Sequence, residues 1–320
     1  MNSNQDRENM MKNSLKTPLR GIIPPMITPL LETDKLDLKG VEQLVEHILS
    51  GEVHGIFILG TTGEFASLSY KIRNELINLV CKQVCGRVPV LVGITDSSFT
   101  ESVALAKTAA NCGADGLVLA PPYYFTSAQP ELLEYLKHIM AQVPLPLFIY
   151  NMPIHTKTVF APDTVKRASD IPGIFGMKDS SANLVYFKEV QHALRHKPDF
   201  TFMVGPEELL SEFVLTGGHG GVNGGANMFP KLYVKLYNAC VARDFDQIET
   251  LQQKVMQIST TIYKVGQYGS SYLKGLKCAL SLMGICNDTL AQPFQRFNEP
   301  ERIKIKNFLD ALEYEKLLMN

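Results

Sequence analysis

The stretch Ile174-Phe175-Gly176-Met177-Lys178-Asp179-Ser180 decides how this chain is interpreted. An apolar run typical of a β-strand ends there in a lysine, and Asp-Ser comes directly after it, which signals the start of a helix. In a strand-then-helix unit this position is the carboxyl end of a parallel strand, where α/β folds gather their catalytic residues. A partly desolvated lysine loses its proton more readily, and the free amine can form a Schiff base with a ketone. Lys178 is therefore a candidate active-site amine, the alternative being a rim lysine whose head reaches water.

Apolar runs alternate with amphipathic stretches on both sides of this unit, and the pattern repeats about every thirty residues. The apolar runs are Gly21–Thr28, Gly55–Leu59, Val88–Val92, Gly116–Ala120, Leu147–Tyr150, Gly173–Lys178, Phe200–Val204 and Gly220–Asn223. The stretches between them predict helices at Leu38–Leu49, Ser69–Val84, Thr100–Asn111, Pro130–Ala141, Pro162–Ala168, Leu184–Arg195, Glu207–Leu215 and Lys231–Ala242. Eight such units predict an α/β protein, a closed (β/α)8 TIM barrel. An open doubly wound sheet is the competing architecture, but no Gly-x-Gly-x-x-Gly comes after the first run.

The alternation stops at Ala242, and the rest of the chain has a helical pattern. Three further helices are predicted, at Asp244–Val265, Ser270–Leu282 and Glu299–Leu318. We expect residues 19–242 to form the barrel and residues 243–320 to form a C-terminal helical region on one flank. Residues 1–18 are polar and lack the apolar stretch of a signal peptide, so we expect a disordered leader there.

Composition and charge limit the classes of partner. The 320-residue chain has a net charge of −1, so no basic field draws it to nucleic acid or to an anionic membrane. No apolar run reaches the length of a membrane span. The six cysteines form no CxxC pair and indicate thiols in a reducing compartment, so a cytoplasmic location is expected. The seven histidines show neither HxH nor HExxH spacing; a metal-dependent reaction is the weaker interpretation, and we expect no metal or nucleotide cofactor.

Two further strand ends carry residues suited to anion binding and to proton transfer. Gly60-Thr61-Thr62-Gly63-Glu64 comes after the second run, and its glycines allow backbone N–H groups to converge on a small carboxylate. An ordinary βα turn is the alternative for this motif. Tyr150 ends the fifth run on the same rim as Lys178, where a phenol can shuttle protons to a reacting carbon. A tyrosine at a strand end can also be a core residue with a capped hydroxyl.

Aromatic and glycine-rich segments accompany these motifs. Ala120-Pro121-Pro122-Tyr123-Tyr124-Phe125 presents two adjacent phenols on a loop stiffened by proline. Thr61 can link Tyr150 to a second phenol in a proton relay. Gly217–Gly225 spans the eighth run and lacks the Lys-Ser/Thr of a P-loop. This segment indicates either close approach of the backbone to a ligand or a tight barrel strand.

Taken together, these motifs resemble the dihydrodipicolinate synthase and N-acetylneuraminate lyase family of class I, pyruvate-dependent aldolases. The resemblance covers residues 19–312, and the motifs agree with the family in order and in spacing. Thr61 and Tyr124 are 63 residues apart, and Tyr124 and Tyr150 are 26 residues apart. A further 28 residues separate Tyr150 from Lys178.

The resemblance implies a mechanism and an assembly. It implies that Lys178 forms the Schiff base with pyruvate or another 2-keto acid, that an aldehyde is the second partner, and that Tyr150 donates and accepts the proton. It implies that Thr61 links Tyr150 to Tyr124. In the synthase branch the residue matching Tyr124 reaches into the neighbouring subunit, within a homotetramer made of two tight dimers.

The same resemblance implies which groups hold the keto acid. The backbone N–H groups of Thr61 and Thr62 would bind the pyruvate carboxylate. Gly205 and the carbonyl of Val222 match further positions that line that pocket.

Two departures from the family pattern bear on the substrate. In the synthases an arginine grips the carboxylate of aspartate semialdehyde, but His155 stands at that position here, and an imidazole is mostly neutral at pH 7. After the seventh strand, Glu207 and Glu208 stand where neuraminate lyases place acidic residues that bind sugar hydroxyls. Carboxylates suit a polyhydroxylated tail, although acidic residues are also favoured in the first turn of any helix.

The sequence supports three hypotheses about function. The preferred one is a Schiff-base lyase or aldolase that acts on a 2-keto-3-deoxy sugar acid or a related hydroxylated 2-keto acid. The second is dihydrodipicolinate synthase itself, which would condense pyruvate with aspartate semialdehyde. The third is a metabolite-binding barrel without turnover, which would not exchange the methyl protons of pyruvate with solvent.

Overall fold

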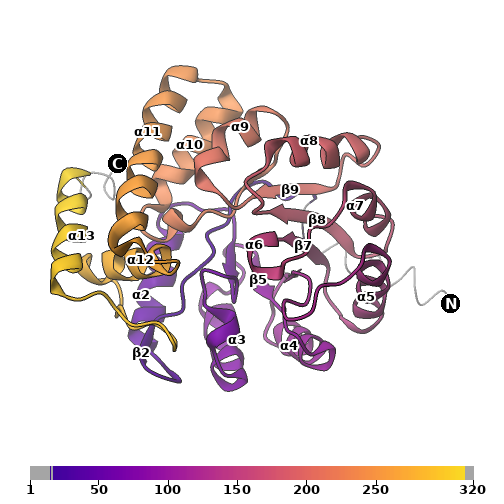
Figure 1. The fold of residues 1–320 in the computed structure, drawn as a ribbon, viewed down its shortest axis with the longest axis horizontal. Helices are drawn as coiled ribbons and strands as arrows, with labels where there is room; N and C mark the ends of the chain where they lie inside the picture. The colour runs from indigo at the N-terminus through magenta and orange to yellow at the C-terminus, as the bar shows by residue number, and fades with distance from the viewer. Residues whose placement is uncertain (1–14, 16, 314–320) are drawn as a thin grey trace.

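The computed structural model describes residue 15 and residues 17–313, which form a parallel barrel ringed by helices (Figure 1). The eight strands of its sheet are β1 (Gly21–Ile22), β4 (Ile56–Ile58), β5 (Val90–Gly93), β6 (Gly116–Leu119), β7 (Leu147–Asn151), β8 (Ile174–Asp179), β9 (Thr201–Val204) and β10 (Gly220–Gly221). Neighbours in the sheet follow chain order, and β1 also pairs with β10. The ring closes where Pro25 bridges Phe57, with the Met26 N–H donating to the Phe57 carbonyl at 2.8 Å. The predicted (β/α)8 barrel is confirmed.

The helices around the barrel begin at capping residues and prolines. They are α2 (Leu38–Leu49), α3 (Tyr70–Val84), α4 (Phe99–Asn111), α5 (Gln129–Gln142), α7 (Pro162–Ala168), α8 (Leu184–Ala193), α9 (Leu210–Leu215) and α10 (Pro230–Ala242). The Asp37 carboxylate accepts the Gly40 N–H at the start of α2, and a proline stands in the first turn of α7 and of α10. The predicted helix Glu207–Leu215 is divided, because a 3-10 turn, η2 (Glu207–Leu209), precedes α9.

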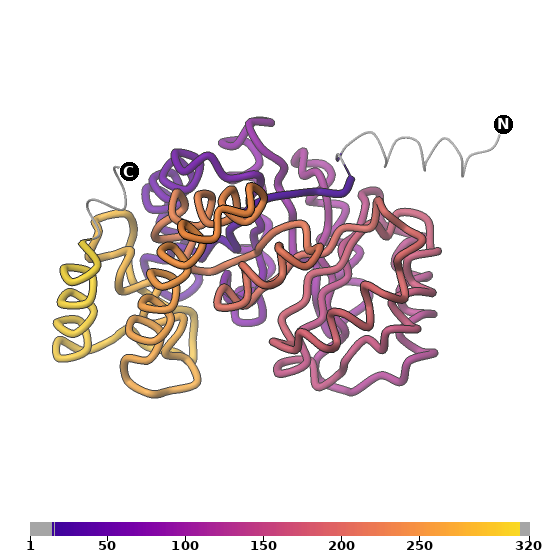
Figure 2. Tube along the Cα trace, turned by 90° about the horizontal axis from the view of Figure 1, so that it is seen from above, coloured from indigo at the N-terminus to yellow at the C-terminus, as the bar shows by residue number. Residues whose placement is uncertain are grey.

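Helices after the barrel gather on one side of it. They are α11 (Phe245–Thr261), the 3-10 segment η4 (Ile262–Gln267), α12 (Ser271–Leu282) and α13 (Glu299–Ala311). Figure 2, seen from above, shows these orange and yellow coils as one flank. The predicted helix Asp244–Val265 breaks near its end, because Val265 is extended and Gly266 has a φ of 82° that favours glycine.

Some predicted and observed elements differ in length. The first strand is shorter than predicted because Pro24 and Pro25 have no N–H to donate to a ladder. The hairpin of β2 (Leu30–Glu32) and β3 (Lys35–Leu36), and the helix α6 (Pro153–Thr156), are too short to give a periodic signal and were not predicted. Residues 1–14 and 16 of the predicted leader, and 314–318 of the last predicted helix, lie outside the described residues.

Side chains of alternating direction build two apolar layers, one inside the barrel and one between the strands and the helices. Phe57 and Phe148 fill the interior and are almost fully buried. Gly176 makes this possible, because a Cβ there would lie 2.3 Å from the Phe148 ring. Gly220 has a similar role at the seam, where a Cβ would lie 1.9 Å from the Gly21 carbonyl oxygen. The glycine-rich segment is thus, at Gly220, a tight barrel strand.

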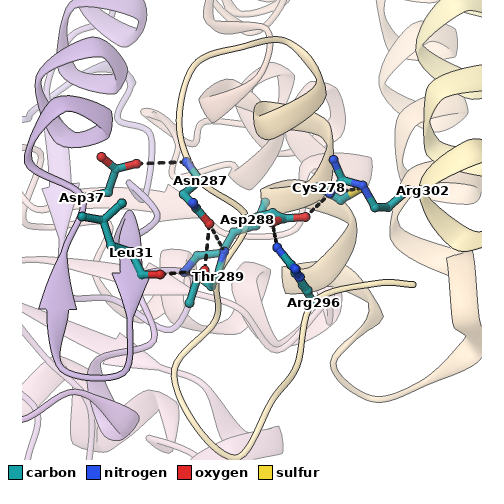
Figure 3. A network of polar contacts seen from close by, with 9 residues as sticks. Leu31, Asp37, Cys278, Asn287, Asp288, Thr289, Arg296 and Arg302 are labelled. Atoms are coloured by element: carbon teal, nitrogen blue, oxygen red, sulfur yellow. Dashed lines mark hydrogen bonds and ion pairs between the residues drawn. The ribbon is translucent and has the colours of Figure 1, made fainter. Parts of the chain in front are cut away.

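Polar contacts fasten the segment after α12 to the barrel and to α13 (Figure 3). The Asn287 N–H donates to the Asp37 carboxylate at 3.1 Å. The buried Asp288 carboxylate pairs with Arg302 of α13, and Arg296 lies 3.9 Å from its other oxygen. Asp37 therefore caps α2 and anchors the C-terminal region at the same time.

Candidate active site

Strand register brings Tyr150 and Lys178 together. They are paired residues on β7 and β8, and a bulge at Phe175 sets the pairing so that both side chains face the barrel interior. The Lys178 Nζ lies 3.9 Å from the centroid of the Tyr150 ring and 5.4 Å from that of Phe57. Both side chains are buried, with Lys178 6% exposed and Tyr150 4% exposed. The structure thus places the predicted amine and the predicted phenol next to each other.

Hydrogen bonds fix the Tyr150 phenol and change its acidity. Its hydroxyl lies 3.2 Å from the Thr61 Oγ1. Burial by itself would raise the pKa of Tyr150, but the charge of Lys178 acts in the opposite direction. Hydrogen bonds from Thr61 and Ser180 add to the effect of that charge, so the pKa of Tyr150 falls below its ordinary value of 10.0. A phenol of lowered pKa gives up and regains a proton more easily near neutral pH.

We expect Thr61→Val to raise the pKa of Tyr150, because the substitution removes a hydrogen bond that lowers it. In a titration of the tyrosinate absorbance, the transition assigned to Tyr150 should move to higher pH. Thr61→Ser keeps the hydroxyl and is the matched control, which should titrate as the wild type does. An unchanged transition in Thr61→Val would show that this hydrogen bond does not set the acidity of the phenol.

Side chains around Lys178 hold the end of β8 in place. The Asp179 carboxylate accepts from the Asn151 amide at 2.8 Å and from the Ser181 hydroxyl at 2.8 Å. Burial raises the pKa of Asp179, although these hydrogen bonds oppose the shift. A Cβ on Gly205 would lie 2.0 Å from the Ser180 Oγ, so glycine leaves room for the hydroxyl that bonds Tyr150. Gly205, a predicted site residue, therefore lies next to Ser180, directly after β9.

The loop after β4, which is predicted to bind a carboxylate, has a tightly turned backbone. The Thr61 carbonyl accepts the Glu64 N–H at 3.0 Å, and Glu64 has a left-handed φ of 58°. The loop thus turns back on itself, in the geometry from which backbone N–H groups can converge on an anion. Thr62 is buried, and its hydroxyl lies 3.1 Å from the hydroxyl of Tyr272, which α12 supplies.

A cavity of about 280 Å³ opens above Tyr150 and Thr61. Its lining also includes, from the barrel loops and the C-terminal region, Glu64, Phe65, Ala66, Ser67, Thr95, Ala120, Tyr123, Met152, His155, Thr156, Gly269, Ser270, Tyr272, Leu273 and Phe294. His155, an exposed residue of α6, contributes its imidazole to this wall. Partial burial lowers the pKa of His155 below its ordinary 6.5, so the ring is neutral at pH 7.

Two other predicted site residues, Val222 and Tyr124, differ in burial. Val222 is buried inside the barrel, where its N–H donates to the Val204 carbonyl at 2.8 Å. Tyr124 is 72% exposed and packs its ring edge-on against Phe125, with 5.0 Å between the centroids. Within one chain the structure therefore does not bring Tyr124 to Thr61, and the neighbouring Tyr123 lines the cavity instead.

The structure corrects the expectation that Glu207 receives substrate hydroxyls. Its carboxylate accepts hydrogen bonds from the hydroxyls of Tyr233 and Tyr263 and from the Gly225 N–H, the last two at 2.9 Å. These protein donors occupy the oxygens, and Glu207 is 3% exposed and absent from the cavity lining. Glu207 thus joins η2 to α10 and η4 in a buried polar network.

Burial raises the pKa of Glu207 to about 7, although the hydrogen bonds from its partners lower it. The unfolded chain, with a pKa near 4.5, therefore releases this proton at lower pH than the folded chain. As the pH rises from 4.5 to 7, titration of Glu207 should lower the free energy of unfolding by up to about 3 kcal/mol. Glu207→Gln should remove that slope in urea unfolding measured across this range. Equal slopes in both proteins would contradict the assignment.

Three residues of the site carry no clear signal in the sequence. In the sequence, Ser180 signals only the start of a helix, and Asn151 is only the residue that comes after Tyr150. Tyr272 lies 210 residues from Thr62 in the chain, and no local pattern connects the two.

Within the described residues, no group of three or more His, Cys, Asp and Glu side chains is placed to hold a metal ion. No helix in residues 17–313 is long and apolar enough to cross a membrane.

Comparisons with known proteins identify the family of the chain. Residues 18–312 match the model of the dihydrodipicolinate synthetase family. The structure of dihydrodipicolinate synthase from Bacteroides thetaiotaomicron superposes with a TM-score of 0.91 at 58% identity, covering 93% of this chain and all of that one. YagE from Escherichia coli K12, solved in complex with pyruvate, gives a TM-score of 0.88 at 28% identity. The superposition covers 93% of this chain and 99% of the YagE chain.

Curated sequences with names for both activities are also similar. The putative 2-dehydro-3-deoxy-D-gluconate aldolase YagE of E. coli K12 is 29% identical over 92% of this chain and 97% of its own length. The 4-hydroxy-tetrahydrodipicolinate synthase of Pseudomonas syringae is 31% identical over 88% of this chain and 94% of its own length. The chain therefore belongs to the dihydrodipicolinate synthetase family of pyruvate-dependent aldolases.

Proposed function

We propose that this protein is a carbon–carbon lyase that binds pyruvate or another 2-keto acid as a Schiff base on Lys178. The preferred substrate class is a 2-keto-3-deoxy sugar acid or a related hydroxylated 2-keto acid. The observation that carries the proposal is the buried Lys178 amine beside the Tyr150 ring, with the phenol held by Thr61. An amine, a proton donor and a carboxylate-binding loop meet at one edge of the barrel, as this reaction requires.

The proposed reaction uses these groups in order. The backbone N–H groups of Thr61 and Thr62 bind the carboxylate, and Lys178 attacks the keto carbon, releasing water as the imine forms. Tyr150 takes the proton of the hydroxyl on C4, and the bond between C3 and C4 breaks to release an aldehyde. The electron pair enters the protonated imine and leaves an enamine, which Tyr150 protonates at C3. Hydrolysis then releases pyruvate and the free amine. This mechanism needs no metal and no nucleotide cofactor.

The wall of the cavity supports a neutral, hydroxylated acceptor. Among the described residues that line it there is no Arg or Lys, and the His155 imidazole is neutral at pH 7. Ser67 and Ser270 line the same space, and a serine hydroxyl can both donate to and accept from an alcohol. A carboxylated aldehyde would leave its charge without a fixed cationic partner there.

The second candidate is the condensation of pyruvate with aspartate semialdehyde. The 58% identity to the Bacteroides thetaiotaomicron synthase favours it, since that identity covers nearly the whole chain. Parallel assays decide between the two: cleavage of 2-keto-3-deoxygluconate, monitored by pyruvate release, and condensation, monitored by formation of the cyclic product. Faster cleavage supports the sugar-acid proposal. Condensation that exceeds cleavage by an order of magnitude in kcat/KM would overturn it.

The proposed assembly is a homotetramer made of two dimers, acting in the cytoplasm. Tyr124 and Phe125 are 72% and 79% exposed, which suits a loop that packs against a second subunit. In that arrangement Tyr124 would extend the relay of Thr61 across the dimer. The six cysteines are free thiols, as suits a reducing compartment.

A further inference from the structure

The carboxylate-binding loop is held at two points from the C-terminal region. Tyr272 of α12 bonds the Thr62 hydroxyl at 3.1 Å. Two residues further along the loop, the buried Glu64 carboxylate pairs with Lys277, also of α12, and accepts the Ala291 N–H at 2.9 Å. The loop that is proposed to bind the carboxylate thus rests on helix α12 and on the segment after that helix.

Tyr272 itself has little freedom to move. Its ring packs edge-on against Tyr263, with 4.8 Å between the centroids. Its hydroxyl fits over Gly224, where a Cβ would lie 1.7 Å away. Tyr263 in turn donates to the buried Glu207 carboxylate at 2.9 Å. Gly224, in the glycine-rich segment, therefore leaves space for the Tyr272 phenol of α12 because glycine has no side chain. Tyr272 also forms part of the cavity wall.

We propose that Tyr272 is a positioning residue of the keto-acid site, and that α12 is thereby part of that site. By holding the Thr62 hydroxyl, it keeps the Thr61–Thr62 backbone in the conformation whose N–H groups face the carboxylate. This inference rests on the proposed function. It adds to that function a specific role for the C-terminal helical region in affinity for the keto acid.

The physical argument is one of preorganisation. A loop that must be ordered when the ligand binds loses affinity by the cost of that ordering, while the chemistry after binding is unaffected. Losing one buried hydrogen bond that orders the loop should therefore weaken pyruvate binding by about 5- to 10-fold. The rate at saturating pyruvate should change by less than about 3-fold, because Lys178 and Tyr150 keep their partners.

The test measures exchange of the pyruvate methyl protons with D₂O by NMR, as a function of pyruvate concentration. Tyr272→Phe keeps the ring and removes the hydroxyl, and Thr62→Val removes the other partner of the same bond. Each should raise the half-saturating pyruvate concentration by about 5- to 10-fold. The double variant should bind pyruvate no more weakly than the single variant with the lower affinity. Tyr186→Phe, which loses a buried phenol hydroxyl that donates to the Phe160 carbonyl at 2.7 Å, is the matched control and should stay within about 2-fold of the wild type.

The outcomes separate this inference from the proposed function. If wild-type protein exchanges the protons and Tyr272→Phe has an unchanged half-saturating pyruvate concentration, the positioning role is overturned and the proposed function stands. Effects that multiply in the double variant would also overturn it, because the two hydroxyls would then act separately. If Tyr272→Phe fails to fold, Thr62→Val and Thr62→Ser answer the same question, since serine should restore the wild-type value. Absence of exchange in folded wild-type protein would overturn the proposed function and this inference together.

Discussion

Lys178→Ala should abolish turnover, with a fall in kcat/KM of at least about 10⁴-fold, because the variant lacks the amine on which the imine is proposed to form. The cavity wall and the Thr61–Tyr150 hydrogen bond remain in this variant, so the fold should persist. Turnover is monitored by the release of pyruvate from the 2-keto acid or by methyl exchange. The unfolding transition is compared with that of the wild type to show that the protein is intact.

A control for this variant removes a lysine outside the chemistry. Lys274 of α12 lies over the rings of Tyr268 and Phe297, at 4.9 and 5.6 Å from their centroids, and has no part in the proposed imine. Lys274→Ala should therefore retain turnover within a few-fold. If folded Lys178→Ala kept activity within about 100-fold of the wild type, covalent catalysis by this lysine would be ruled out.

Tyr150→Phe should lower kcat by about 10²- to 10⁴-fold, the usual contribution of a positioned general acid–base. The ring stays beside Lys178, but the hydroxyl that Thr61 holds at 3.2 Å is lost. Imine formation needs fewer proton transfers from this position than bond cleavage does. We therefore expect borohydride to trap pyruvate on this variant while cleavage of the sugar acid becomes very slow.

The control for Tyr150→Phe is Tyr123→Phe, at a phenol that lines the same cavity and has an edge-on contact with Phe65. That variant should lose little activity if Tyr150 alone moves the proton. Equal losses in both variants would indicate that the phenols serve only as walls of the cavity. A wild-type rate in Tyr150→Phe would mean that another group transfers the proton.

Much of the fold could be predicted from the sequence because barrel strands and helices give strong local patterns. The run that ends at Lys178 and the run that ends at Tyr150 are both predicted at the same rim, and β-sheet register does pair them. Neighbouring parallel strands whose ends carry polar residues must present them side by side. Strand and helix positions are harder to predict where proline or glycine interrupts the pattern, as at Pro24 and Gly266.

The polar network behind the loop could not be predicted, because its members are distant in sequence. The resemblance to neuraminate lyases predicts that Glu207 lies in the substrate pocket. Its orientation instead depends on Tyr233 of α10 and Tyr263 of η4, which lie 26 and 56 residues further along the chain. Tyr272 reaches Thr62 in the same way. Side-chain partners of this kind depend on tertiary packing, and no periodicity in the chain reports them.

The most direct test of the central claim is reduction with borohydride in the presence of pyruvate, with the adduct then located by peptide mass spectrometry. Lys178→Ala serves as the control. The mechanism predicts a reduced pyruvate adduct on the peptide that contains Lys178, absent without pyruvate and absent from the variant. Folded wild-type protein that gives no adduct, or one located on another lysine, would contradict it.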